Sequence, residues 1–163
     1  MSSIFVTTLL WVAALSSGIM AGVYFAFSGF IMQAFNKLSA SQAVAAMNVI
    51  NVTILRSVFM PLFFASTIVS LFLVIAGLFY WSETGAGLMM VAGLVYFIGM
   101  FICTAIFNVP LNNRLASLEP DSENLNKIWP HYFQTWTNWN HLRAVSSLVT
   151  CVVCIWLLSS NYC

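Results

Sequence analysis

The sequence predicts an all-α integral membrane protein, a four-helix up-down bundle forming a single domain over residues 1–163. The first observation is composition: 61% of the residues are hydrophobic and only 6% are charged, whereas soluble domains carry about 25% charged residues. The second is the presence of four long apolar segments that contain no Asp, Glu or Lys. The net charge of +1 leaves no basic face for nucleic acid, so we expect no nucleic-acid partner.

The four predicted spans have lengths that suit a lipid bilayer, since about 20 apolar residues cross a hydrocarbon core of roughly 30 Å. They cover residues 4–30, 57–80, 87–107 and 141–159. The first span lacks a preceding basic stretch, so we expect it to stay in the membrane rather than be removed as a signal peptide. Lys37 lies in the first loop, and Arg114 and Lys127 lie in the third. The positive-inside rule then places both loops in the cytoplasm and both termini outside. We expect the membrane to be a bacterial inner membrane.

Small residues recur at every fourth position of the first span: Ala14, Gly18, Gly22 and Ala26. Such a ladder allows two helix backbones to approach closely in lipid. We expect this face to pack against a neighbour, either within the bundle or across a homodimer.

An amphipathic helical segment is predicted over residues 40–56, ahead of the second span. Ser39 and Gln42 have the spacing of a capping box. The segment either lies at the membrane interface or faces the bundle interior. Pro61 follows and predicts a kink, because proline lacks a backbone N–H. Arg56 is expected to reach the headgroups, with a counter-ion inside the bundle as its alternative role.

The third span is predicted to end in a distorted turn that leads into a polar loop over residues 108–128. Val109 precedes Pro110, and a residue before proline is biased away from the α region. Asn108 and Asn112 flank this break. Their amides either satisfy the freed backbone groups or point into a pocket.

The segment "WPHYFQTWTNWNHLR", residues 129–143, holds both histidines and three of the six tryptophans. Pro130 suits the first turn of a helix, which we expect to continue into the last span. Spacings of three and four place these residues on one stripe of that helix: Trp129, Tyr132, Trp136, Trp139, Arg143 and Ser146. An interfacial belt accounts for part of the aromatic content. Because ionisable groups at membrane depth usually face an interior, Asn140, His141 and Arg143 together predict a sheltered pocket.

The chemistry of this cluster suits proton abstraction from a hydrophobic carbon or phenol acid. A histidine can act as general base near neutral pH, and an arginine, which keeps its proton, can stabilise the resulting anion. Two histidines without acidic residues in the spans fall short of a usual zinc or iron site, so no metal is predicted. A haem with His141 as axial ligand is the alternative. His131, nearer the loop, is expected at the solvated surface.

Several stretches together resemble the anthrone-oxygenase-like family of small four-helix membrane proteins. They are "AGVYFAFSGFIMQAF" (21–35), "AAMNVIN" (45–51), "FNVPLNNRLA" (107–116) and the Trp/Tyr/Trp/Trp-Asn-His-x-Arg pattern over 129–143. Characterised members oxidise anthrones to anthraquinones with molecular oxygen, so the resemblance implies a hydrophobic aromatic substrate, O2 as oxidant and no required cofactor.

The resemblance also implies roles for individual residues. His141 would be the base and Arg143 the anion stabiliser. Tyr132 is a further motif position in the substrate site. Asn108, Asn112 and Asn140 would hold substrate oxygens, with Trp136 and Trp139 stacking on the rings.

Two other functions stay open on the sequence. One is a haem-binding or electron-transfer membrane protein with His141 as ligand. The other is a non-catalytic protein that binds lipid or quinone, in which the aromatic cluster is an anchor in the membrane interface.

Overall fold

The computed structural model describes residues 4–118 and 124–160, and these residues are helical with short connections and without a strand. The predicted all-α class is confirmed. The helices are α1 (Ile4–Ala26), the π-helical turn η1 (Phe27–Ile31), α2 (Met32–Phe35), α3 (Ala40–Ile54), α4 (Phe59–Phe79), α5 (Ala86–Tyr96), the π-helical turns η2 (Phe97–Ile102) and η3 (Thr104–Asn108), α6 (Val109–Ala116) and α7 (Leu125–Ser160).

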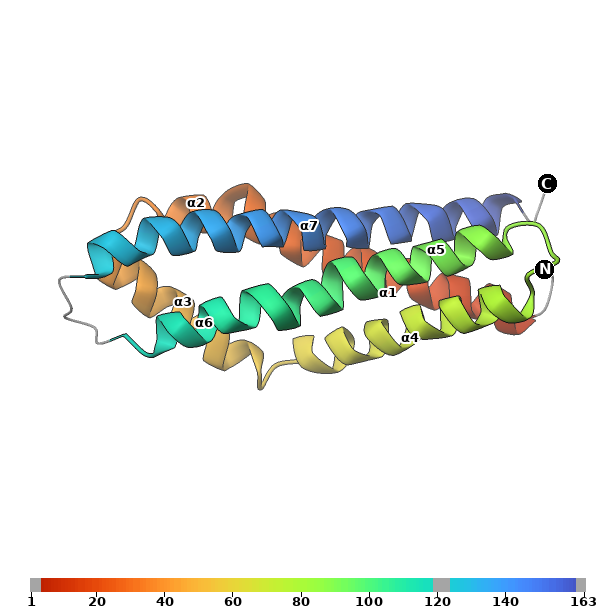
Figure 1. The fold of residues 1–163 in the computed structure, drawn as a ribbon, viewed down its shortest axis with the longest axis horizontal. Helices are drawn as coiled ribbons and strands as arrows, with labels where there is room; N and C mark the ends of the chain where they lie inside the picture. The colour runs from red at the N-terminus through yellow and green to blue at the C-terminus, as the bar shows by residue number, and fades with distance from the viewer. Residues whose placement is uncertain (1–3, 119–123, 161–163) are drawn as a thin grey trace.

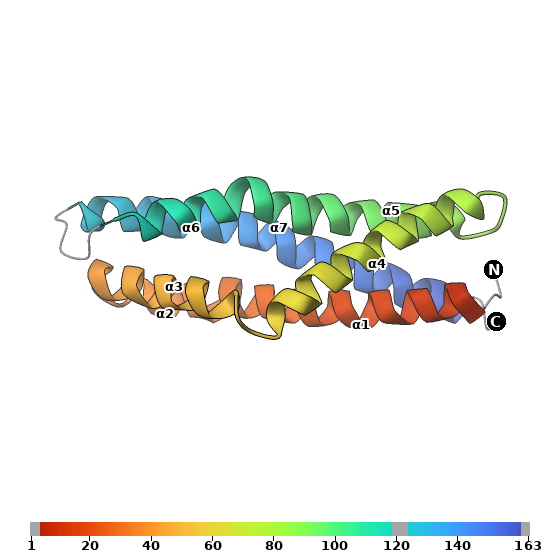
Figure 2. The ribbon, with the colours of Figure 1, turned by 90° about the horizontal axis from the view of Figure 1, so that it is seen from below.

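The described part of the chain contains four helical stretches that are long and apolar enough to cross a membrane. They are Ile4–Phe35, Phe59–Phe79, Ala86–Ala116 and Leu125–Ser160. They lie along one long axis, with the start of α1 and the end of α7 at the same end of the molecule (Figures 1 and 2). The shorter helix α3 lies at the opposite end, where it packs against α6 and α7.

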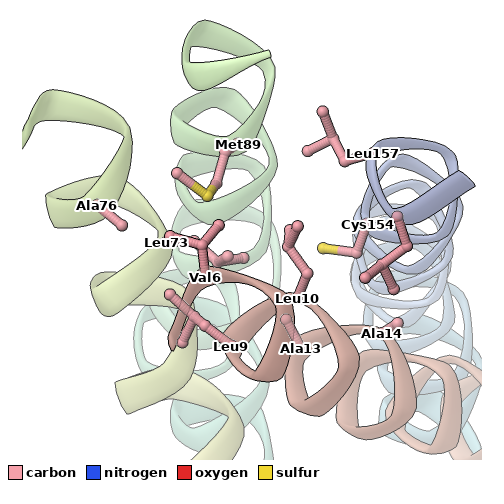
Figure 3. Close-up of a cluster of buried hydrophobic side chains, with 11 residues drawn as sticks. Val6, Leu9, Leu10, Ala13, Ala14, Leu73, Ala76, Met89, Cys154 and Leu157 are labelled. Atoms are coloured by element: carbon pink, nitrogen blue, oxygen red, sulfur yellow. The ribbon is translucent and has the colours of Figure 1, made fainter. Parts of the chain in front are cut away.

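The outward faces of these helices carry large apolar side chains, among them Trp11, Ile68, Ile98 and Val149. Such faces suit lipid, which offers no penalty for exposed hydrocarbon. Near the chain ends, Val6 and Leu10 of α1 point into a dry interior (Figure 3). There they meet side chains of three other helices, including Leu73, Met89 and Cys154. This cluster joins α1, α4, α5 and α7.

Glycine permits the closest helix contacts in the bundle. A Cβ at Gly93 of α5 would collide with the backbone of Ser70 on α4. In the predicted ladder of α1, Ala14 is buried, and a Cβ at Gly18 would approach Cys151 Sγ of α7 to 3.2 Å. At Gly22 a Cβ would meet no atom of the described chain within 4 Å. Ala14 and Gly18 of the ladder therefore pack within the bundle. A homodimer through the remaining positions of the ladder stays a prediction.

Helix α3 begins at Ala40, where Ser39 and Gln42 form the predicted capping box. The predicted kink at Pro61 is wrong. The chain instead leaves the helix between Ile54 and Phe59, and the hydroxyl of Ser57 accepts a hydrogen bond from the Phe59 N–H at 3.2 Å. Pro61 thus lies in the first turn of α4, where a missing N–H costs no intrahelical bond.

The predicted polar loop over 108–128 is wrong at both of its ends. The third membrane helix continues as α6 to Ala116, and α7 already begins at Leu125; residues 119–123 lie outside the described part. Pro110 is accommodated because the preceding turn, η3, is π-helical, and such widened turns relieve a local conflict without ending the helix. The expected distortion is present, but it does not break the helix. Pro130 likewise lies inside α7 rather than at its start.

Candidate functional site

Arg143 of α7 is buried in the bundle, with 6% of its surface exposed. Its Nη2 donates to Asn140 Oδ1 at 2.6 Å, and its Nη1 donates to Thr104 Oγ1 at 3.4 Å. Its Cζ lies 4.5 Å from the ring centroid of Tyr24 and 5.0 Å from that of Trp136. Aromatic faces attract a cation, but the spans contain no Asp or Glu. The positive charge is therefore held by neutral groups.

Asn140 fixes the guanidinium relative to α1. Its side chain is fully buried, and its Nδ2 donates to the Tyr24 carbonyl at 2.7 Å and to Ser28 Oγ at 2.6 Å. Its Oδ1 accepts from Arg143. Because both ends of the amide are occupied, Asn140 has a defined orientation and holds the Arg143 fork in one position.

Two polar atoms at this cluster find no hydrogen-bond partner among the described residues. They are the Nε of Arg143 and the hydroxyl of Tyr24, and both are buried. Leaving a polar group unpaired in a membrane interior is costly. The Arg143 Nε–H and the Tyr24 hydroxyl can both donate a hydrogen bond. Together they would suit a ligand oxygen atom that carries negative charge.

Asn112 of α6 organises a second polar cluster. Its Oδ1 accepts from the Tyr132 hydroxyl and from Trp136 Nε1, both at 2.9 Å, while its Nδ2 donates to Asn51 Oδ1 at 3.0 Å. Asn108 is buried, and its Nδ2 donates to the Trp136 carbonyl at 3.3 Å. The amides of Asn108 and Asn112 thus tie α6 and η3 to α7.

Trp136 belongs to both clusters. Its indole N–H is bonded to Asn112, and its ring lies against the guanidinium of Arg143. The two clusters therefore form one polar interior that extends from the middle of α7 toward α3. Six of the predicted site residues come together here, namely Asn108, Asn112, Tyr132, Trp136, Asn140 and Arg143.

The prediction that His141 shares this interior is wrong. Its side chain is exposed on the outer face of α7. An α-helix turns by about 100° per residue, so residues two apart point in nearly opposite directions, and burial of Arg143 turns His141 outward. The catalytic role proposed for His141 and its role as haem ligand both stay predictions. His131 is exposed, as expected.

Trp139 also departs from the predicted arrangement. It is half-buried, and its ring stacks on Phe107 with centroids 3.6 Å apart and planes inclined by 5°. Its face is thus covered by a side chain of η3. The predicted enclosed pocket around Arg143 stays a prediction. A described cavity of about 180 Å³ between α6 and α7 touches this interior through Tyr132.

Partners contributed by the other helices were not among the predicted site residues. Tyr24 and Thr104 contact the guanidinium, Ser28 binds Asn140, and Asn51 binds Asn112. Tyr24 and Ser28 are spaced by four, which places them on one helix face and was the available signal. Within the described ranges, no three His, Cys, Asp or Glu residues gather as a metal site would require.

The family model described as anthrone oxygenase matches residues 51–153. The match covers more than half of the chain and includes Asn51, Asn112, Trp136 and Arg143. No curated protein matches the chain significantly, and neither does any solved structure. With its four apolar helices and this match, the chain belongs to the anthrone oxygenase family of membrane proteins.

Proposed function

We propose that this protein oxidises a hydrophobic aromatic compound of the anthrone, phenol or quinol type with O2, and that Arg143 stabilises the anion formed from it. One observation carries the proposal. A buried guanidinium has only neutral partners, and its Nε and the neighbouring Tyr24 hydroxyl are unpaired within the described chain. An arginine in this setting favours a ligand that becomes negatively charged.

In the proposed reaction the substrate is an anthrone. Loss of a proton from its CH2 group gives an enolate whose charge lies largely on the ketone oxygen. A cation beside that oxygen stabilises the anion strongly, since charges interact more strongly in a buried site of low dielectric constant. The carbanionic carbon adds O2, and the peroxide takes up a proton. Loss of the second hydrogen of that carbon with cleavage of the O–O bond releases water and forms the second ketone, so anthrone and O2 give anthraquinone and water.

The residues of the two clusters have separate roles in this proposal. Arg143 donates to the enolate oxygen, with the Tyr24 hydroxyl as a second donor. Trp136 supplies an aromatic surface, while Asn140 positions the guanidinium and Asn112 positions the indole. Since His141 points away from Arg143, the proton acceptor in this proposal is water rather than His141.

The chain's placement in the membrane belongs to the same proposal. Lys37 lies between α2 and α3, Arg114 lies near the end of α6, and Lys127 lies near the start of α7. We therefore place this end of the bundle on the cytoplasmic side of a bacterial inner membrane, with both termini outside. A hydrophobic substrate would then reach the site from the lipid.

The test uses the purified full-length protein in detergent micelles. Anthrone oxidation is followed by O2 uptake and by the absorbance of the anthraquinone. Arg143→Gln removes the charge and is expected to lower kcat/KM by about 100-fold, the usual loss for a donor to a developing oxyanion. Arg143→Lys, which keeps the charge, is expected to retain a larger share. Arg56→Gln is the matched control, because Arg56 is exposed.

Two results would contradict the proposal. One is wild-type turnover in a folded Arg143→Gln variant, and the other is a wild-type protein that oxidises no anthrone or quinol offered. A haem absorption band in the purified protein would instead support the electron-transfer function.

A further inference from the structure

Helix α3 presents two asparagines one turn apart toward the polar interior. Asn48 and Asn51 are spaced by three residues, so their side chains lie on the same helix face. The Oδ1 of Asn48 and the Nδ2 of Asn51 are buried, and neither has a hydrogen-bond partner among residues 4–118 and 124–160. Such unpaired atoms are rare in native interiors and call for a partner.

The free atom of Asn51 is fixed as a donor by its neighbours. The indole N–H of Trp136 can only donate, so the Asn112 atom that faces it at 2.9 Å must be the oxygen. The other end of the Asn112 amide is therefore its NH2 group. This group donates to Asn51 at 3.0 Å, so the Asn51 atom that receives it must be the oxygen. What remains free on Asn51 is an N–H donor.

A free donor and a free acceptor on the same helix face together complement a hydroxyl group. A hydroxyl can accept from Asn51 Nδ2 and donate to Asn48 Oδ1, and the two amides do not bond to each other. An ether or ketone oxygen could use only the Asn51 donor, and an ammonium could use only the Asn48 acceptor.

We propose that Asn48 and Asn51 form a hydroxyl-binding subsite for the aromatic ligand. This inference rests on the proposed function, from which it takes the class of ligand. Asn51 is bonded to Asn112, which is bonded to Trp136, whose ring lies 5.0 Å from the Arg143 Cζ. The Asn112 amide and the Trp136 indole thus link the asparagine pair to the oxyanion site.

The position of the hydroxyl on the ligand follows from its chemistry. A phenol hydroxyl next to the ketone donates its hydrogen to that ketone and cannot donate to Asn48. The subsite therefore selects a ring hydroxyl remote from the ketone that Arg143 binds.

The test measures binding without turnover, using quinones that are already oxidised. The probes are 2-hydroxyanthraquinone, 2-methoxyanthraquinone and unsubstituted anthraquinone, titrated against the full-length protein in micelles and followed by tryptophan fluorescence. Wild type is expected to bind the hydroxyl compound roughly tenfold tighter than the unsubstituted one, as for a net gain of one or two hydrogen bonds. The methoxy compound accepts from Asn51 but cannot donate, so its affinity is expected to lie between the two.

Variants of Asn48 separate the two hydrogen bonds. Asn48→Leu keeps the side-chain size and removes the acceptor, so the hydroxyl and methoxy compounds are expected to bind equally. Asn48→Asp keeps an acceptor oxygen and is expected to keep the preference for the hydroxyl. Asn113→Leu on the exposed face of α6 is the matched control and is expected to behave as wild type.

The outcomes distinguish this inference from the proposed function. Equal affinity of wild type for all three probes, as expected if only water fills the site, would overturn the subsite. So would an unchanged hydroxyl preference in a folded Asn48→Leu variant. A wild type that oxidises anthrone without preferring the hydroxyl contradicts the subsite alone. A hydroxyl preference without any oxidation contradicts the proposed function and leaves the subsite in place.

Discussion

Near the chain ends the bundle is filled by apolar side chains such as Leu10, Leu73 and Met89 (Figure 3), whereas from its middle toward α3 buried amides and a guanidinium lie among the apolar and aromatic side chains. The same long helix, α7, passes through both regions, contributing Cys154 to the first and Arg143 to the second. Apolar packing needs no specific partner, but each buried polar group needs one. Burying the polar region therefore costs more free energy than burying the apolar one. This cost indicates that the polar region has a function other than holding the helices together.

Local helix geometry differs between the regions in the same way. The π-helical turns η1 and η3 adjoin the Arg143 cluster and contain Ser28 and Thr104 respectively. In contrast, the parts of α1 and α4 that form the apolar region are regular α-helix. Single π-helical turns occur frequently at functional sites. The comparison predicts that changes in the polar region alter activity, while changes in the apolar region alter stability.

The largest effect is expected from Arg143→Gln in the polar region. Alongside its roughly 100-fold loss of kcat/KM, we expect its thermal unfolding temperature to stay at or above that of wild type, because the charge it removes is buried without a carboxylate partner. Thermal unfolding in micelles measures this. A variant that loses activity only because it unfolds would remove the distinction between the two regions.

The next largest effect is expected from Leu10→Ala in the apolar region. Leu10 is completely buried, and the cavity left by its truncation is expected to lower the free energy of unfolding by about 2 kcal/mol. Activity per folded molecule is expected to stay within twofold of wild type. Denaturant titration and O2 uptake on the same sample check both values. Leu15→Ala, at an exposed position of the same helix, is the control and should change neither.

A smaller effect is expected from Asn140→Leu, which removes the hydrogen bond at 2.6 Å that positions the Arg143 guanidinium. Without this hydrogen bond the guanidinium keeps its charge but loses its fixed orientation. We therefore expect kcat to fall roughly tenfold. The exposed Asn138→Leu substitution on the same helix serves for comparison. If Asn140→Leu and Asn138→Leu had equal activity, Asn140 would have no positioning role.

The smallest effect is expected from His141→Ala. Because His141 is exposed on the face of α7 away from Arg143, its removal should change kcat/KM by less than about threefold, as for a residue outside the transition-state contacts. His131→Ala, also exposed on α7, is the matched control. A loss of 100-fold in His141→Ala alone would restore the base role expected from the sequence.

Parts of this picture were accessible from the sequence because they depend on local chemistry. The start of α3 follows from Ser39 and Gln42, which form the capping box within one turn. The buried stripe of α7 was visible because Tyr132, Trp136 and Arg143 interrupt the apolar pattern at helical spacing. The outward direction of His141 was also accessible, since a residue two positions from a buried one faces away from it.

That the chain is helical and apolar enough for a membrane follows from the sequence, since length and hydropathy are properties of each segment alone. Which polar groups meet depends on the tertiary packing. Asn140 bonds Ser28 across 112 residues, and Asn112 bonds Asn51 across 61. Helices that are apolar on all sides carry little pattern to show which face turns inward, so the pairing of these amides depends on how the helices pack against one another.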